Sequence, residues 1–216
     1  MTLGLLHTSA VHVPVFDGLR DADHPGLELR HHVAEELLAR ARREGPDAVA
    51  PAVRAALAQA ARDGAAAVLC TCSTIGGVAE RAGADLGLAV VRVDRPMAAA
   101  AVAAGDRVVV LAAVASTVGP TSALVEEEAR RAGRDVTVRA ELVDQVDQVW
   151  ALFEAGDAEG YARGVARAVR EVRDADVIVL AQASMAGAAA LVPEVRVPVL
   201  SSPRPGLAAA AALAAG

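Results

Sequence analysis

The sequence contains no lysine and no asparagine, so all 21 of its basic residues are arginine. A lysine is needed for the Schiff base of pyridoxal phosphate or of an aldol reaction, and for the phosphate contact of a P-loop. Aromatic residues make up only 2 % of the chain, so stacking platforms for bases or flavin are scarce. These absences remove several large classes of cofactor enzyme.

Cysteine, basic charge and long apolar runs are scarce too. The only cysteines, Cys70 and Cys72, are too close together to staple a chain of 216 residues, which agrees with a reducing compartment. The net charge is −6, and the basic residues form no cluster in the sequence. Both observations argue against a nucleic-acid partner. The sequence shows neither an uncharged run of about 18 apolar residues nor a signal peptide, so we expect no membrane span and a cytoplasmic location.

Short apolar runs alternate with helical patterns, which predicts an α/β fold with parallel sheets. The predicted strands are 2–7, 27–30, 66–69, 89–93, 107–112, 135–140, 176–181 and 197–200. Residues 8–26 and 115–122 are predicted as loops and residues 31–43 as a helix, and Val146 is predicted on the inward face of another helix. A short echo between residues 68–73 (VLCTCS) and 179–184 (VLAQAS) indicates two similar halves whose strand ends face one cleft.

The stretch 65–77, AAAVLCTCSTIGG, is a buried strand that ends in small polar residues and turns into a helix. Ligands of parallel α/β sheets bind at the carboxyl ends of strands, and a helix N-terminus favours an anion, a thiolate included. Cys72 is therefore the candidate catalytic residue, and Ser73 and Thr74 are candidates to hold a substrate carboxylate. A small buried residue followed by ordinary helix caps is the alternative. Cys70 is predicted to lie in the core, and without a third ligand the two cysteines predict no metal site.

Other candidates lie at the remaining strand ends. His7 ends the first strand and is a candidate acid/base, because histidine titrates near neutral pH; a structural role is the alternative. Thr117, Gln182 and Ser184 follow later strands and are candidates to bind substrate, with helix capping as the alternative.

Several basic residues lie in predicted loops or at a helix start. His31 and His32 open the predicted helix 31–43, where we expect a surface position. Three arginines in loops could bind a carboxylate, and the sequence does not choose among Arg20, Arg95 and Arg204.

This ordered set of motifs resembles the aspartate/glutamate racemase superfamily, which includes glutamate, aspartate and hydantoin racemases, maleate isomerase and arylmalonate decarboxylase. The turn at 72–74, CST, is similar to the family's Cys-Asn-Thr turn; the AST loop at 115–117 and the run VIVLAQASMAG at 177–187 also match. The resemblance covers nearly the whole chain. HTSA at 7–10 and LSSPRPG at 200–206 resemble an uncharacterised branch.

The resemblance implies two pseudo-symmetric lobes, residues 1–95 plus 199–216 carrying the Cys72 turn and residues 96–198 carrying Thr117 and Gln182. It implies an active site in the cleft between them, no pyridoxal phosphate or metal, a small carboxylate substrate and a homodimer. Racemases of this family carry a second cysteine where this chain has Gln182 or, in a gap-free comparison, Ala183. Glutamine neither removes nor returns a proton at neutral pH.

Three hypotheses remain. A racemase would use Cys72 with a partner other than cysteine, such as His7. A decarboxylase or a cis-trans isomerase of the same superfamily would need one thiol only. A protein that keeps the cleft but has lost turnover would bind a small molecule without converting it.

Overall fold

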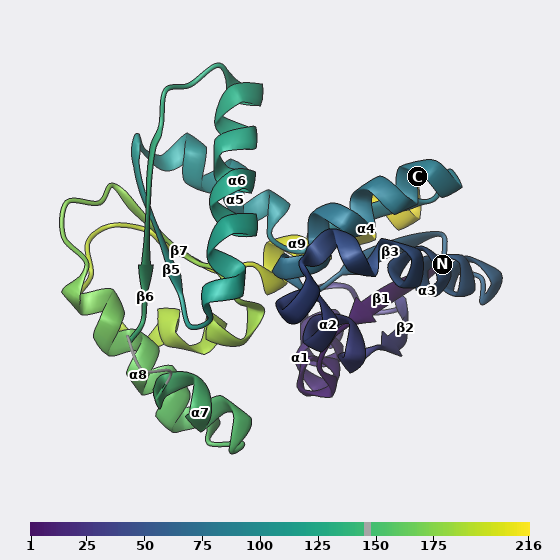
Figure 1. Ribbon diagram of the computed structural model, residues 1–216, viewed down its shortest axis with the longest axis horizontal. Helices are drawn as coiled ribbons and strands as arrows, with labels where there is room; N and C mark the ends of the chain where they lie inside the picture. Colours follow the sequence, from purple (N-terminus) through teal and green to yellow (C-terminus); the bar gives the residue numbers. More distant parts are fainter. Residues whose placement is uncertain (145–147) are drawn as a thin grey trace. The chain divides into compact units, whose positions relative to one another are not determined.

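The computed structural model describes residues 1–144 and 148–216 (Figure 1). Val146, predicted on a helix face, lies outside these residues. The chain divides into two compact units, Met1–Asp94 with Pro203–Gly216 and Arg95–Ser202, and each is built on a four-stranded parallel sheet flanked by helices. The predicted α/β fold is confirmed.

The first unit contains the sheet β2-β1-β3-β4. Its strands are β1 (Thr2–His7), β2 (Glu28–Val33), β3 (Ala67–Cys70) and β4 (Ala89–Arg92). Its helices are η1 (Ala10–His12), α1 (Val13–Asp23), α2 (Glu35–Glu44), η2 (Pro46–Val49), α3 (Ala50–Arg62), α4 (Ser73–Leu86) and α9 (Pro203–Ala215).

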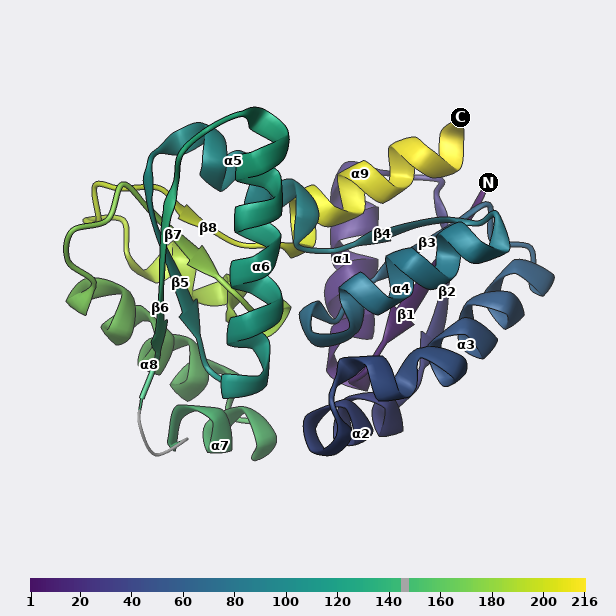
Figure 2. The same cartoon turned by 45° about the horizontal axis from the view of Figure 1, so that its top comes forward.

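Apolar clusters cover both faces of this sheet, as a parallel sheet requires. Residues of α2, α3 and α4 pack against one face around Val68 and Cys70. Residues of α1 and α9 pack against the other face around Leu69 and Val91. Figure 2 shows α9 running beside β4.

The second unit contains the sheet β6-β5-β7-β8. Its strands are β5 (Arg107–Ala112), β6 (Thr137–Leu142), β7 (Val177–Leu180) and β8 (Val199–Leu200). Its helices are α5 (Arg95–Ala104), α6 (Ala115–Ala132), α7 (Gln148–Glu154), α8 (Ala158–Glu171) and η3 (Ala183–Leu191). Residues of α5 and α6 cover one face and residues of α7, α8 and η3 the other.

The predicted lobe boundary at 198/199 is wrong. β8 pairs in parallel with β7, with Ile178 opposite Val199, so these residues belong to the second sheet. The chain returns to the first unit only at Pro203, where α9 begins.

Three local predictions are also wrong. Residues 8–26 contain α1, where Pro14 suits the first helical turn and Phe16 anchors the helix in the core. His31 and His32 lie in β2, opposite two leucines of β1, so the helix begins only at Glu35. The predicted loop 115–122 is the first half of α6.

In the part of the chain that the structure describes, none of the helices combines the length and the apolar character that a membrane crossing needs.

Candidate active site

Cys72 occupies the position that the sequence predicts. It is the N-cap of α4, with extended backbone angles of φ −110° and ψ 114°, and it follows the buried strand β3. The residue is 9 % exposed, so a small molecule that reached it would leave bulk water. Ser73 and Thr74 form the buried first turn of α4. The N–H groups of such a turn have no carbonyl partner within the helix and can hold an anion beside the thiol.

Both cysteines are buried, and Cys70 is buried more completely than Cys72. Cys70 is the last residue of β3 and is fully buried in the core, and burial raises the pKa of its thiol. Its Sγ lies 3.7 Å from the carbonyl oxygen of Cys72, to which it donates a weak hydrogen bond. The predicted core role of Cys70 is confirmed by this burial, and Cys72 stays the candidate reactive thiol.

His7 lies at the end of β1 as expected, and its surroundings oppose protonation of the ring. Burial first, and then the neighbouring histidines, lower the pKa of His7 to about 3. Its Nδ1 lies 2.8 Å from the hydroxyl of Thr71, and its Nε2 lies 2.8 Å from Nδ1 of His31. His31 in turn reaches Asp17 at 3.3 Å. Both ring nitrogens are occupied, so His7 braces the residue that precedes Cys72.

Gln182 is the counterpart of Cys72 in the second unit. β3 and β7 hold the same place in their sheets and pair in the same register with β1 and β5. Cys72 lies two residues beyond Cys70, the end of β3, and Gln182 lies two residues beyond Leu180, the end of β7. Each is the N-cap of the next helix. The register therefore selects Gln182, and not Ala183, as the residue in the place of a second cysteine.

The amide of Gln182 connects two segments of its own unit. Its Oε1 accepts a hydrogen bond from the backbone N–H of Ala113 at 3.0 Å, and its Nε2 donates one to the Thr117 hydroxyl at 3.0 Å. Thr117 lies in the buried first turn of α6. The structure thus brings two predicted site residues into contact, at a strand end and at a helix start.

Ser184 has a partner that the sequence did not reveal. Its hydroxyl lies 3.0 Å from the hydroxyl of Tyr161 on α8. Burial raises the pKa of Tyr161 to about 12, against the opposing effect of the Ser184 hydrogen bond, so the phenol stays neutral. The helical pattern places Tyr161 inward, but no sequence signal predicts which group its hydroxyl meets.

The three candidate arginines are all engaged in ion pairs. Arg20 pairs with Asp21 at 2.6 Å and with Asp17 at 3.4 Å. The other two pairs are Arg95 with Glu127 and Glu128, and Arg204 with Asp23. No observation therefore favours an arginine as the carboxylate ligand, and the first turn of α4 is the better candidate.

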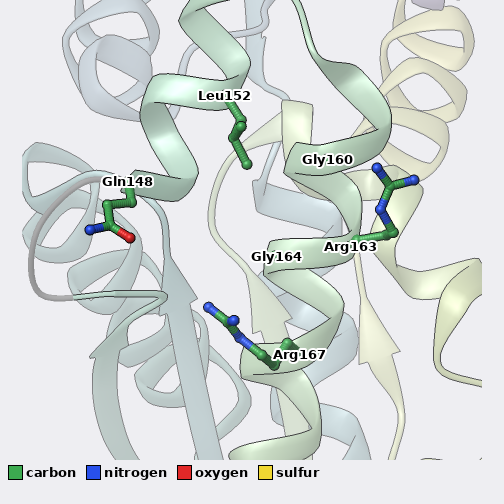
Figure 3. A pocket seen from close by; sticks show the side chains of 6 residues that line it. All are labelled: Gln148, Leu152, Gly160, Arg163, Gly164 and Arg167. Carbon is green, nitrogen blue, oxygen red and sulfur yellow. The ribbon is translucent and has the colours of Figure 1, made fainter.

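An open pocket of about 510 Å³ lies between α7 and α8 (Figure 3). Gln148, Leu152 and Arg167 line it together with Arg163 and two glycines of α8. Arg167 extends toward the side where Gln148 lies, whereas Arg163 points the other way and bonds Glu159. None of the residues predicted for the site lines this pocket, so it gives no reason to move the site away from Cys72.

Among residues 1–144 and 148–216, no three histidine, cysteine or acidic side chains are arranged to hold a metal ion.

One comparison with known proteins identifies a family. Residues 9–212 match the model of the family described as Asp/Glu/Hydantoin racemase. No curated protein matches the chain. An aspartate racemase from Picrophilus torridus superposes with a TM-score of 0.73 at 15 % identity, over 99 % of this chain and 94 % of that one.

Two further structures are similar. An allantoin racemase from Klebsiella pneumoniae gives a TM-score of 0.65 at 18 % identity, over 100 % of this chain and 88 % of that one. An arylmalonate decarboxylase gives 0.64 at 20 % identity, over 100 % and 93 %. At these identities the structures establish a shared fold.

Proposed function

The chain belongs to the Asp/Glu/hydantoin racemase family, and from this premise we propose that it is a one-thiol enzyme acting on a small carboxylate. Cys72 carries the proton or attacks the substrate, and the reaction needs neither pyridoxal phosphate nor a metal. A chain without lysine cannot form the Schiff base of pyridoxal phosphate, which supports that part of the proposal.

One observation carries the choice of chemistry, namely the state of Gln182. Racemisation needs one group to remove the α-proton and another to return a proton from the opposite face. The counterpart of Cys72 is an amide whose oxygen and nitrogen are both used within the second unit. An amide does not exchange a proton at neutral pH, which favours reactions that a single thiol completes.

Two reactions meet this requirement. In decarboxylation of a substituted malonate, the bond to one carboxylate breaks, carbon dioxide leaves, and the electron pair stays on the α-carbon as an enediolate. The Cys72 S–H then protonates that carbon, and the thiolate recovers its proton from water. In cis-trans isomerisation the thiolate adds to an alkene carbon, the resulting single bond rotates, and the thiolate leaves again.

The other site residues have supporting roles in this proposal. The first turn of α4, with Ser73 and Thr74, holds the substrate carboxylate through N–H groups and hydroxyls. Thr117, Gln182 and Ser184 remain proposed substrate contacts from the second unit. His7 holds Thr71, next to Cys72, instead of moving a proton.

The first experiment incubates the protein in heavy water with a panel of amino acids, hydantoins and substituted malonates. NMR follows deuterium uptake and loss of carboxylate, and chiral chromatography follows the hand of the product. We expect Cys72→Ser to abolish turnover and Cys70→Ala to preserve it, because Cys70 is a core residue. Turnover that survives in Cys72→Ser would contradict the proposal.

The alternatives give different results in the same experiment. A product of both hands, with deuterium delivered to both faces, indicates a racemase with an unrecognised second base. Tight binding without turnover, unchanged in Cys72→Ser, indicates a binding protein. The homodimer and the cytoplasmic location stay predictions, which light scattering and cell fractionation test.

A further inference from the structure

A buried ion pair lies beside the Cys72 turn and has no part in the chemistry proposed above. Arg92, the last residue of β4, is 4 % exposed, and Asp94 is 0 % exposed. The Arg92 Nε donates to one carboxylate oxygen of Asp94 at 2.6 Å, and Nη2 donates to the other at 2.8 Å. Taking two charges out of water gains little net stability. The pair therefore calls for a reason other than stability.

Arg92 connects β4 to α4 at two points. Its Nη2 also donates to the carbonyl oxygen of Ser73 at 3.3 Å, so the guanidinium reaches the first residue of the helix. Its backbone N–H donates to the Glu80 carboxylate at 3.3 Å, further along the helix. Because Cys72 is the residue just before Ser73, the position of this turn fixes the position of the thiol.

Gly76 leaves the room that Arg92 needs. A Cβ atom built at Gly76 would lie 2.8 Å from the Arg92 Cβ, closer than real contacts allow, and 3.0 Å from its Nε, which is a tight contact. A Cβ at the neighbouring Gly77 would meet no atom closer than 3.6 Å. The path of Arg92 over the first turn of α4 therefore depends on a glycine at one position and not at the next.

We propose that Arg92, held in place by Asp94, is a positioning residue that fixes the first turn of α4 and thereby the exposure and reactivity of Cys72. The fork of the guanidinium matters, because it serves both oxygens of Asp94 and the Ser73 carbonyl together. A lysine carries the same charge but cannot make these contacts in one plane.

The test measures how fast each cysteine is alkylated by iodoacetamide in the native protein, followed by peptide mass spectrometry. In Arg92→Lys we expect Cys72 to react about tenfold faster, the factor that accompanies loss of a charge-assisted hydrogen bond. Gly76→Ala displaces the Arg92 side chain and should give the same result with the arginine intact. Two matched controls on α4 should leave the rate unchanged, Gly77→Ala and Arg81→Lys, whose arginine pairs with Asp47 at the surface.

Cys70 provides the internal reference. It lies in the core of the same unit, so its alkylation reports global opening. A rise at Cys72 alone supports the positioning role. Parallel rises at both cysteines, or no change at either, overturn the proposal. The measurement needs no substrate, so a failure of the proposed enzymatic function is distinguishable from a failure of this inference.

Discussion

The two units share a backbone plan and differ in the chemistry at their strand ends. Strand order, parallel pairing and register are the same in the two sheets. In the first unit, strand ends carry ionisable groups, namely His7, Cys72 and Arg92. In the second unit the equivalent places of the first two hold Ala112 and Gln182, which do not ionise. Ionisable groups thus lie at the strand ends of the first unit, and an alanine and a neutral amide lie at the equivalent places of the second.

The helices after the equivalent strands β3 and β7 differ as well. β3 leads into α4, an α-helix of 14 residues, whereas β7 leads into η3, a 3-10 run of nine residues. Long 3-10 runs are uncommon and have poorer hydrogen-bond geometry. The field that favours an anion at a helix start is therefore better developed behind Cys72 than behind Gln182.

The largest expected effect breaks the comparison at its centre. Once a substrate is known, Cys72→Ser should lower kcat by about 10³-fold, the usual contribution of a general acid or base. Gln182→Ala removes two hydrogen bonds in the second unit. It should leave more than a tenth of the activity, because the loss of neutral hydrogen bonds lowers a rate by ~10-fold at most. Steady-state kinetics of both variants provide the measurement. Equal losses of kcat in the two variants would contradict the proposal that the reactive group lies in the first unit only.

Acid should separate the units next, because all five histidines lie in the first. Burial lowers the pKa of His7 to about 3 and that of His12 to about 4. Below pH 6.5 these two histidines are therefore protonated in the unfolded chain but stay neutral in the folded chain. The first unit keeps its full stability above pH 6.5 and loses stability as the pH falls. At pH 5 each of the two histidines lowers the free energy of unfolding by about 2 kcal/mol.

The second unit should resist to lower pH. The pKa of Asp176 is lowered to about 2, first by its hydrogen bond from Arg107, so this carboxylate loses its stabilising effect only below pH 4. Hydrogen exchange at pH 5, corrected for intrinsic rates, should show faster exchange only in the first unit, residues 1–94 and 203–216. Trp150, the only tryptophan, reports the second unit, and a simultaneous change in its fluorescence would argue against independent acid responses.

A third variant makes the units alike. Gln182→Cys places a thiol at the counterpart of Cys72 in the second unit. Loss of the bonds to Ala113 and Thr117 should lower the free energy of unfolding by about 1–2 kcal/mol. Gln182→Ala is the matched control, since it loses the same bonds and gains no thiol. Urea unfolding of both variants provides the measurement, and an unchanged free energy of unfolding would refute the expectation.

A last pair of variants tests the stability of each unit separately. Gly18 lies within α1 with no atom near the position of an added Cβ, so Gly18→Ala should stabilise the first unit by about 0.5–1 kcal/mol. Gly164→Ala forces a Cβ to 2.8 Å from Val149 and should destabilise the second by about 1–3 kcal/mol. Acid unfolding of the first unit should shift to lower pH in Gly18→Ala and not in Gly164→Ala. Residue-level hydrogen exchange measures this shift.

The strand pattern predicts much of this fold. β1 and β5 begin and end where the apolar runs do, because both strands are buried on two faces. The sequence does not predict the full extent of the edge strand β2. Its two adjacent histidines do not show the alternation of apolar and polar residues that marks a strand, and their place in β2 follows only from the pairing with β1. The segment 8–26 fails for a related reason, because proline and glycine signal turns yet here occupy α1.

The site divides in the same way. The thiol turn is a local signal, a strand followed by a helix start, and Cys72 follows from it. The Arg92–Asp94 pair is not local, because its meaning depends on Ser73 and Gly76, which lie on another element. The sequence contains a partial signal for this pair. Two charged residues end an otherwise apolar strand, and the preceding helix contains adjacent glycines. Only the fold connects the two.

The place of α9 has a consequence for biosynthesis. Its Leu207 and Ala210 cover the face of β3 and β4 in the unit that carries Cys72, and Gly206 lies close to the backbone of Val93. A ribosome makes this helix after every residue of the second unit. The second unit can therefore fold during translation, while the apolar face of the first sheet waits for residues 203–216. The sheet of the first unit is therefore covered on both faces only after the second unit has been synthesised.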